Sequence, residues 1–259
     1  MRDVKMDPLR SFERIMKILH CFSFEQPHLS IEDIVEKTSY PKSTVYRLLV
    51  TLEKSGLIQY DTRDNLYRLG YKFLEFGGIV HENLDIKREA EPILSELHKA
   101  TNYTVLLGVR QRDVIQYVLS FDSKDEFLSR SYVGRSRDLH YGALGIVLMS
   151  YMPEQEVKEV LRHSPLVKRT PYSLMDEDKL YERLKQVREQ GFYVDIDETF
   201  VGFTAIAVPI FRRNGEIHDA IGIAAAGFKL EGENQAKIIS LIKEAAEQIS
   251  QRLGYIPHS

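Results

Sequence analysis

Basic and hydrogen-bonding side chains cluster between residues 42 and 51, in a segment whose apolar residues recur at helical spacing. Lys and Arg neutralise phosphates, Ser and Thr hydroxyls bond phosphates or base edges, and Arg can bond guanine with two hydrogen bonds. Any surface helix also has a solvated polar face, so this segment alone leaves both interpretations open. The candidate DNA-contacting residues are Lys42, Ser43, Thr44, Tyr46, Arg47 and Thr51.

The preceding residues predict two further helices that would position this segment. Residues 11–22 carry an apolar stripe at helical spacing, formed by Phe12, Ile15, Met16, Leu19 and Phe22. Ser30, with Asp33 three residues later, has the pattern of a capping box at the start of a second helix. Pro41 suits the first position of the third helix, which is expected to end at Gly56.

A short hairpin is expected after the third helix. Residues 57–60 and 66–69 read as strands joined by a polar turn, and Arg63 near its tip would reach an adjacent DNA backbone or minor groove. Three helices followed by a hairpin are the layout of a winged helix. Residues 71–84 then predict a connecting helix interrupted by Gly77 and Gly78.

The rest of the chain mixes helices with apolar, β-branched runs. Asn214-Gly215 between two such runs is a strong hairpin signal. Helices are expected at 87–100, 143–151, 154–161, 176–190 and 234–253, and strands at 104–109, 113–119, 192–196, 203–211 and 217–225. This mixture predicts an α+β domain with a mainly antiparallel sheet. The expected divisions are a winged helix-turn-helix domain at 1–70, a linker helix at 71–85, and an effector-binding and oligomerisation domain at 86–259.

Composition limits the kind of DNA contact and the compartment. With 35 Lys and Arg against 38 Asp and Glu, the 259-residue chain has a formal net charge of -3, so basic DNA contacts must be local. The sequence shows no signal peptide and no apolar stretch long enough for a membrane span. The single cysteine, Cys21, fits a reducing compartment. We therefore expect a cytoplasmic protein.

An enzyme is the main alternative from another class, because His140, Asp195, Asp197 and Glu198 include the side chains of metal or acid–base sites. Nucleophile-elbow, paired-histidine, phosphate-loop and dinucleotide motifs are all absent from the sequence. We therefore expect no catalytic residues, no metal and no cofactor. A third interpretation is an interaction module whose C-terminal domain only oligomerises the DNA-binding heads.

Several ordered motifs resemble the IclR family of bacterial transcription regulators. They are PKSTVYRLL at 41–49, YRLG at 67–70, LHYGALG at 139–145 and IAVP at 206–209. The resemblance covers nearly the whole chain. It implies a winged helix-turn-helix, a linker helix and a GAF-like effector domain, in homodimers or homotetramers that bind palindromic double-stranded DNA operators. The implied function is a regulator, most simply a repressor, of a metabolic operon under control of a small metabolite.

The same resemblance implies an effector site. The matching positions are Gly142, Ala143, Asp195, Phe203, Ala205, Gly222 and Ala224. Small residues allow close approach of a ligand to the backbone, and a helix beginning near Ala143 would offer its positive end to a carboxylate or phosphate. Asp195 would accept a hydrogen bond from a ligand hydroxyl. The glycines and alanines would equally serve tight helix-to-sheet packing.

Two departures from the family pattern bear on the ligand. Ile146 stands where the family often has Lys, and Gly222 and Ala224 stand where sensors of small acids have serines. Each lost hydroxyl removes a partner for an anionic ligand. The sequence therefore predicts a less polar and roomier pocket than that of the family's sensors of short keto acids.

Overall fold

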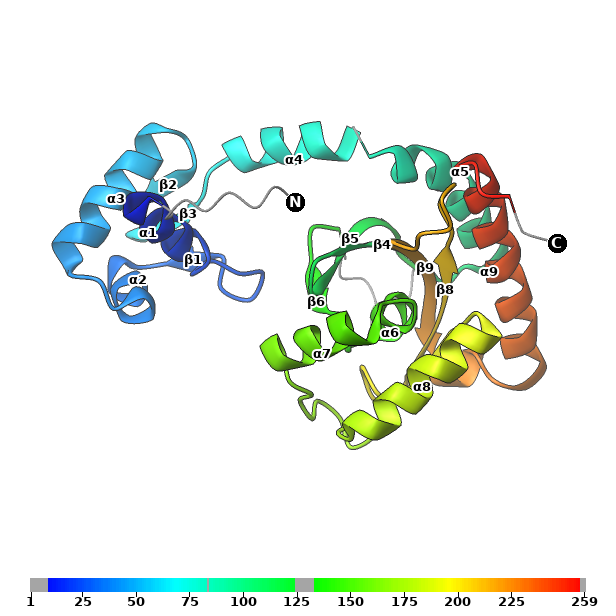
Figure 1. Cartoon of the computed structure of the whole chain (residues 1–259). Coiled ribbons are helices and arrows are strands. Elements are labelled where there is room, and N and C mark those ends of the chain that lie inside the picture. The colour runs from blue at the N-terminus through cyan, green and yellow to red at the C-terminus, as the bar shows by residue number, and fades with distance from the viewer. Residues whose placement is uncertain (1–8, 83, 124–132, 257–259) are drawn as a thin grey trace. The chain divides into compact units, whose positions relative to one another are not determined.

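The computed structural model describes residues 9–82, 84–123 and 133–256. The chain divides into two compact units, Met1–Asn83 and Leu84–Ser259, each with its own internal contacts (Figure 1). The remaining parts of the predicted domains, at 1–8, 83, 124–132 and 257–259, lie outside the described residues.

The N-terminal unit is the expected winged helix. Its helices are α1 (Arg10–Leu19), α2 (Ile31–Thr38), α3 (Lys42–Lys54) and α4 (Lys72–Glu82), and its strands are β1 (His28–Leu29), β2 (Ile58–Asp61) and β3 (Leu66–Leu69). The strands form an antiparallel sheet in the order β1-β3-β2. The two-residue strand β1 was not predicted, because its pairing with β3 joins segments about forty residues apart in the sequence.

Some of the sequence-based predictions of helix starts and apolar faces in the N-terminal unit are confirmed, and others are corrected. Ser30 Oγ accepts a hydrogen bond from the Asp33 amide at 3.1 Å and the Asp33 carboxylate accepts one from the Ser30 amide at 2.8 Å, which is the predicted capping box. Pro41 lies one position earlier than expected, at the N-cap of α3. The apolar stripe of α1 is corrected: Phe12 is 59% exposed, and Ile18 is the fully buried residue of this helix.

The connecting helix α4 is continuous, so the predicted interruption at Gly77 and Gly78 is wrong. A glycine inside a helix costs about 1 kcal/mol relative to alanine, which weakens a helix without ending it. A Cβ built on either glycine would have no atom within 4 Å, so no close packing requires glycine here.

The C-terminal unit is an α+β domain built on one antiparallel sheet, in agreement with the predicted fold class (Figure 1). Its helices are α5 (Asp85–Thr101), α6 (Ala143–Ser150), α7 (Glu154–His163), α8 (Glu177–Gln190) and α9 (Gly232–Arg252), with a 3-10 turn, η1 (Gly227–Lys229). The strands are β4 (Thr104–Gln111), β5 (Val114–Phe121), β6 (Ser136–Asp138), β7 (Tyr193–Ile196), β8 (Phe203–Ile210) and β9 (Asp219–Ala226). They pair in the order β6-β5-β4-β9-β8-β7.

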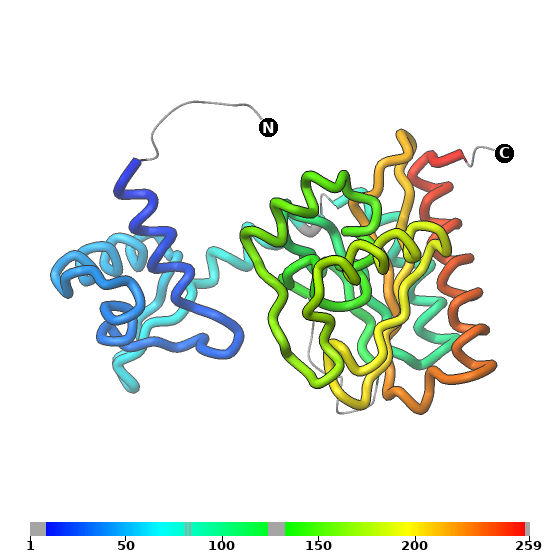
Figure 2. The backbone as a smooth tube through the Cα atoms, turned by 60° about the horizontal axis from the view of Figure 1, so that its bottom comes forward, coloured from blue at the N-terminus to red at the C-terminus, as the bar shows by residue number. Residues whose placement is uncertain are grey.

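Helices cover both faces of this sheet. α5 and α9 pack on one face around a core that includes Leu94, Leu107, Ile223 and Ile242, while α6, α7 and α8 cover the other face (Figures 1 and 2). The predicted hairpin at Asn214-Gly215 joins β8 to β9, and Gly215 takes a left-handed φ of 76° that favours glycine. The sequence missed the short edge strand β6.

Candidate DNA-binding face and ligand cavities

The N-terminal half of α3 presents most of the predicted DNA-contacting side chains on one exposed face. Lys42, Ser43, Tyr46, Arg47 and Thr51 are exposed, whereas Thr44 is half-buried. The opposite face of α3 is anchored in the core through side chains that are at most 1% exposed, namely Val45, Leu49 and Leu52. A rigid helix with a polar outer face can enter a major groove.

Two of the predicted DNA-contacting cations, Lys42 and Arg63, have acidic neighbours. Lys42 Nζ lies 2.6 Å from Glu32 Oε1 on α2, and both side chains are more than 60% exposed. Arg63 follows β2 in the wing turn, and its guanidinium makes two bonds to Asp61, at 3.1 and 3.2 Å. The Lys42–Glu32 pair is exposed at both side chains and contributes little stability, so a phosphate can compete for Lys42.

Hydrogen bonds from Arg63 to the Asp61 side chain, with Arg68 also nearby, lower the pKa of Asp61 to about 2. Asp61 therefore remains ionised over the physiological range and holds the wing turn through charged hydrogen bonds. Arg63 itself is 87% exposed, so its position at the wing is open to a partner.

In the C-terminal unit, six of the seven predicted effector residues line one cavity, which we call the Ala224 cavity. They are Gly142, Ala143, Asp195, Phe203, Ala205 and Ala224. The cavity occupies about 450 Å³, a volume that includes its opening to solvent. It lies where the start of α6 meets β8 and β9.

Gly222 is the predicted residue that the structure does not bring into this cavity. A Cβ at Gly222 would lie 2.4 Å from Leu144 Cδ1 and 3.3 Å from the Ile206 carbonyl oxygen. Gly222 therefore permits close packing of α6 on β9, which is the alternative that the sequence left open.

Arg137 also lines the Ala224 cavity, from β6, and no motif in the sequence predicted it. Its guanidinium lies over three aromatic rings, those of Tyr117 at 5.7 Å, Tyr141 at 5.3 Å and Phe200 at 5.3 Å. Cation–π contacts of this kind orient a guanidinium. The cavity thus combines an oriented cation with aromatic and small apolar walls.

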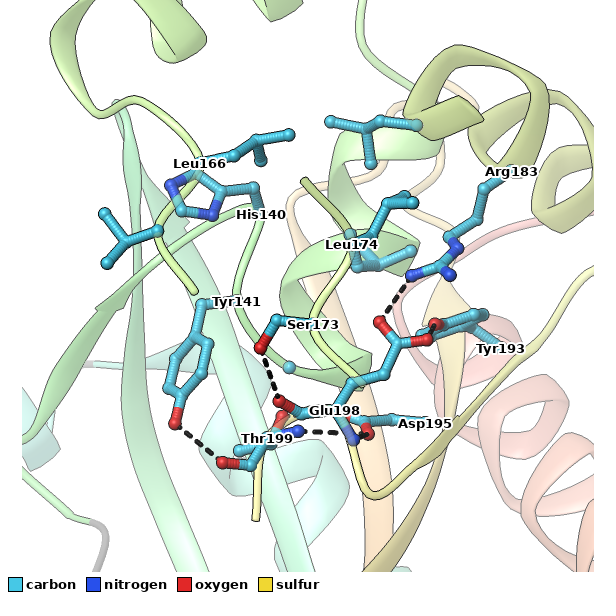
Figure 3. A pocket seen from close by; sticks show the side chains of 14 residues that line it. His140, Tyr141, Leu166, Ser173, Leu174, Arg183, Tyr193, Asp195, Glu198 and Thr199 are labelled. Carbon is cyan, nitrogen blue, oxygen red and sulfur yellow. Dashed lines mark hydrogen bonds and ion pairs between the residues drawn. The ribbon is translucent and has the colours of Figure 1, made fainter. Parts of the chain in front are cut away.

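A second cavity lies beside the first, and we call it the Arg183 cavity (Figure 3). Arg183 on α8 donates from Nη1 to Glu198 Oε2 at 2.6 Å, and the Tyr193 hydroxyl donates to Glu198 Oε1 at 3.0 Å. His140 lies across the cavity, with Nε2 3.2 Å from Ser164 Oγ. Burial lowers the pKa of His140, which favours the neutral imidazole near neutral pH.

Residues Gly142, Asp195 and Thr199 line both cavities and form the wall between them. Asp195 is 3% exposed, and its Oδ1 accepts from the Glu198 amide at 3.0 Å and from the Thr199 amide at 3.3 Å. Its other oxygen accepts from the Thr199 hydroxyl. Burial raises the pKa of Asp195 despite these bonds. Its side chain therefore holds the loop that follows β7.

His140, Asp195, Asp197 and Glu198 do not form a metal cluster. Asp197 Oδ1 accepts from the Gly202 amide at 2.6 Å, and Glu198 bridges Arg183 and Tyr193. Within residues 9–82, 84–123 and 133–256, no three His, Cys, Asp or Glu side chains are arranged to hold a metal ion. Across the same ranges, every helix is too short or too polar to cross a membrane.

Comparison with known proteins accounts for both units. Residues 11–62 match the model of the IclR helix-turn-helix domain, and residues 79–251 match that of the bacterial transcriptional regulator IclR C-terminal domain. The HTH-type transcriptional regulator KdgR of Dickeya chrysanthemi is 30% identical over 253 residues, covering 98% of this chain and 83% of that protein. The HTH-type transcriptional regulator XynR of Escherichia coli (strain K12) is 30% identical over 250 residues, covering 96% and 99%. The crystal structure of a regulator from Alicyclobacillus acidocaldarius has a TM-score of 0.83 at 25% identity, covering 96% of this chain and 100% of that one.

A winged helix joined to an α+β domain, in a chain whose relatives are regulators along nearly its whole length, defines a DNA-binding transcription regulator with an effector-binding domain. The chain belongs to the IclR family. The same relatives bear out the expectation that it is not an enzyme.

Proposed function

We propose that the protein is a cytoplasmic repressor of a metabolic operon, in which α3 enters the major groove and the wing contacts the adjacent DNA. The main support for DNA binding through α3 is its exposed polar face, from Lys42 to Thr51, on a helix anchored by buried leucines. Arg47 is the proposed base reader, because it is exposed near the N-terminal half of the helix. Lys42 and Arg63 are the proposed phosphate contacts, and Ser43, Thr44, Tyr46 and Thr51 complete the face.

The test is a gel-shift titration at fixed salt, with DNA flanking the gene or duplexes selected from random sequence. Arg47→Ala should weaken specific binding by about 1–3 kcal/mol, a factor of roughly 5 to 150, and relax specificity at one position. Lys185→Ala, an exposed lysine on α8, is the charge-matched control. If the Arg47 variant bound DNA with wild-type affinity and specificity, α3 would be rejected as the helix that contacts the bases.

We infer that the effector is a carboxylate with an aromatic or apolar body, bound in the Ala224 cavity. Arg137 supplies an oriented cation, and the start of α6 at Ala143 adds a positive helix end to the same cavity. Phe200 and Phe203 supply aromatic walls, and the small side chains of Ala205 and Ala224 leave room for the ligand body. This chemistry agrees with the expectation of a pocket less polar than that for short keto acids.

A thermal-shift panel of benzoate, cyclohexanecarboxylate, pyruvate and benzamide tests this inference. A ligand at about a hundred times its Kd should stabilise the native protein by about 2.7 kcal/mol, which corresponds to roughly 5–10 °C. Arg137→Gln should abolish the response to the aromatic acid, while Arg162→Gln on the exposed side of α7 should keep it. No response to any carboxylate in the panel would refute the proposed ligand class; if broader screening also found no effector, that would favour an oligomerisation module.

We also propose that the protein is a homodimer, or a tetramer of paired dimers, on a palindromic operator. Residues 71–85, which include α4, would form the linker between domains 1–70 and 86–259. Helix α4 exposes Leu74 by 72%, Phe76 by 47% and Val80 by 62%, and exposed apolar patches mark interaction surfaces. A second copy would cover such a face symmetrically. Effector binding would then bias the spacing of paired winged helices. Sedimentation velocity should show a dimer that Leu74→Glu weakens; a monomeric wild type would contradict the proposal.

A further inference from the structure

The Arg183 cavity carries a set of polar groups that the proposed effector site does not use. We propose that it is a second small-molecule site, which binds an uncharged molecule with adjacent hydroxyl groups. The polar wall consists of Arg183, Glu198, Tyr193 and Ser173, and apolar side chains such as Leu166 and Leu174 line the same cavity (Figure 3).

The guanidinium and the carboxylate on the polar wall of this cavity neutralise each other. Arg183 and Glu198 form an ion pair at 2.6 Å, and His140 favours its neutral form. Asp195 already accepts hydrogen bonds from Glu198 and Thr199. A ligand carboxylate would face Glu198, and a ligand ammonium would face Arg183. The balance therefore favours a neutral ligand.

Hydrogen-bonding capacity remains on both members of the ion pair. Among the described residues, Nη1 is the Arg183 nitrogen that has a hydrogen-bond partner, and a guanidinium carries five N–H donors. Glu198 accepts one side-chain bond at each carboxylate oxygen, and each oxygen has a second lone pair. A hydroxyl both donates and accepts, so two neighbouring hydroxyls match a carboxylate beside a guanidinium.

The other polar groups support the same ligand chemistry. Burial raises the pKa of Tyr193, which keeps its phenol protonated as it donates to Glu198. Ser173 Oγ lies 3.4 Å from the Glu198 carbonyl oxygen and holds the loop before α8 against this wall. Leu166 and Leu174 can cover the C–H side of a polyol (Figure 3). Mixed polar and apolar walls are typical of small-molecule sites.

Stability alone gives little reason for this network. Desolvating an ion pair can cost as much as its Coulomb attraction returns, and apolar side chains in its place are often neutral or stabilising. Arg183 and Glu198 remain 23% exposed each at the cavity, where a ligand could reach them. A binding role accounts for a charged pair at this position.

The test uses full-length protein with labelled Ile, Leu and Val methyl groups, titrated by NMR with glycerol, erythritol and xylitol. We expect shifts at Ile146, Leu166 and Leu174 that saturate, while 1,3-propanediol and glycerate, at the same concentrations, produce none. Site-resolved shifts are needed because polyols stabilise proteins generally through exclusion from their surface.

Variants distinguish a polyol-binding site from a cavity that holds only water. Glu198→Gln should weaken binding roughly tenfold or more, because it removes a charged acceptor. If the Glu198 variant fails to fold, Ser173→Ala and the cavity-filling Leu174→Phe serve in its place and should also weaken binding. Glu182 is exposed on α8, so the control variant Glu182→Gln should bind the polyol as the wild type does. Absent or non-saturating shifts in the wild type, or equal shifts in the Leu174→Phe variant, would overturn the proposal.

Discussion

Gly145→Ala tests how closely α6 must approach the chain that precedes it. A Cβ at Gly145 would lie 2.2 Å from the Leu139 carbonyl oxygen and 2.9 Å from its carbonyl carbon. These are backbone atoms, so a rotamer change cannot relieve the clash, and α6 would have to move away from its contacts with β8 and β9. Overpacking of this kind costs about 3 kcal/mol. Helix propensity returns about 1 kcal/mol, which leaves a net loss of about 2 kcal/mol.

The assay is urea unfolding of the full-length protein, followed by far-UV circular dichroism and by tyrosine fluorescence, since the chain has 14 Tyr and no Trp. The expected loss corresponds to a melting temperature lower by roughly 4–8 °C. Gly227→Ala in the same unit is the matched control, because its Cβ would meet nothing closer than 3.5 Å. A Gly145 variant as stable as the wild type would refute the claim that α6 is seated against Leu139.

Three further substitutions have defined expected outcomes. Gly222→Ala should lose about 1–3 kcal/mol in urea unfolding and push Leu144 toward the Ala224 cavity, weakening effector binding as well. Gly77→Ala should instead raise the stability of the N-terminal unit by about 0.5–1 kcal/mol, because its Cβ meets open space within a helix. Asp219 is fully buried, and burial raises its pKa although Arg212 bonds it at 2.8 Å. A raised folded-state pKa means that the stability contributed by this group falls as pH rises from its unfolded value of 3.8 toward the higher folded value. The stability of the Asp219→Asn variant relative to the wild type should therefore increase as pH rises above about 4. The opposite trend with pH would show that Arg212 more than offsets the burial of the carboxylate.

The elements of the winged helix could be predicted because their signals are local. The capping pair Ser30 and Asp33, the apolar stripe of α3 and the polar wing turn each lie within a few residues of sequence. Strands β1 and β6 could not be predicted in the same way, because three residues or fewer carry little periodicity and depend on partners far along the chain. Arg137 lies on β6, so the residue with the clearest ligand chemistry was missed with its strand.

The cavity residues show a second limit of sequence reasoning. The family resemblance assigned both Gly222 and Ala224 to the effector site. The two residues are two positions apart on β9 and therefore face the same side of the sheet, but different atoms lie above them. Leu144 packs on Gly222, whereas Ala224 lines the cavity. Arg183 and Glu198 lie fifteen residues apart on different elements, with no spacing rule to pair them. Such constellations depend on how α8 packs beside the loop after β7, which only the fold determines.

Two of the corrections in the N-terminal unit, those to α1 and α4, concern apolar surfaces that this unit does not cover. Periodicity correctly marks Phe12 as part of an apolar face, but it does not say whether that face packs within the chain or against another molecule. The same holds for α4, where Leu74 and Val80 remain exposed on a helix that two glycines weaken. Isolated helices of this length are marginal in water, so packing from outside the unit would supply the stability that its sequence lacks. The proposed self-association would therefore account both for the two glycines in α4 and for the apolar residues that this helix exposes in a single copy.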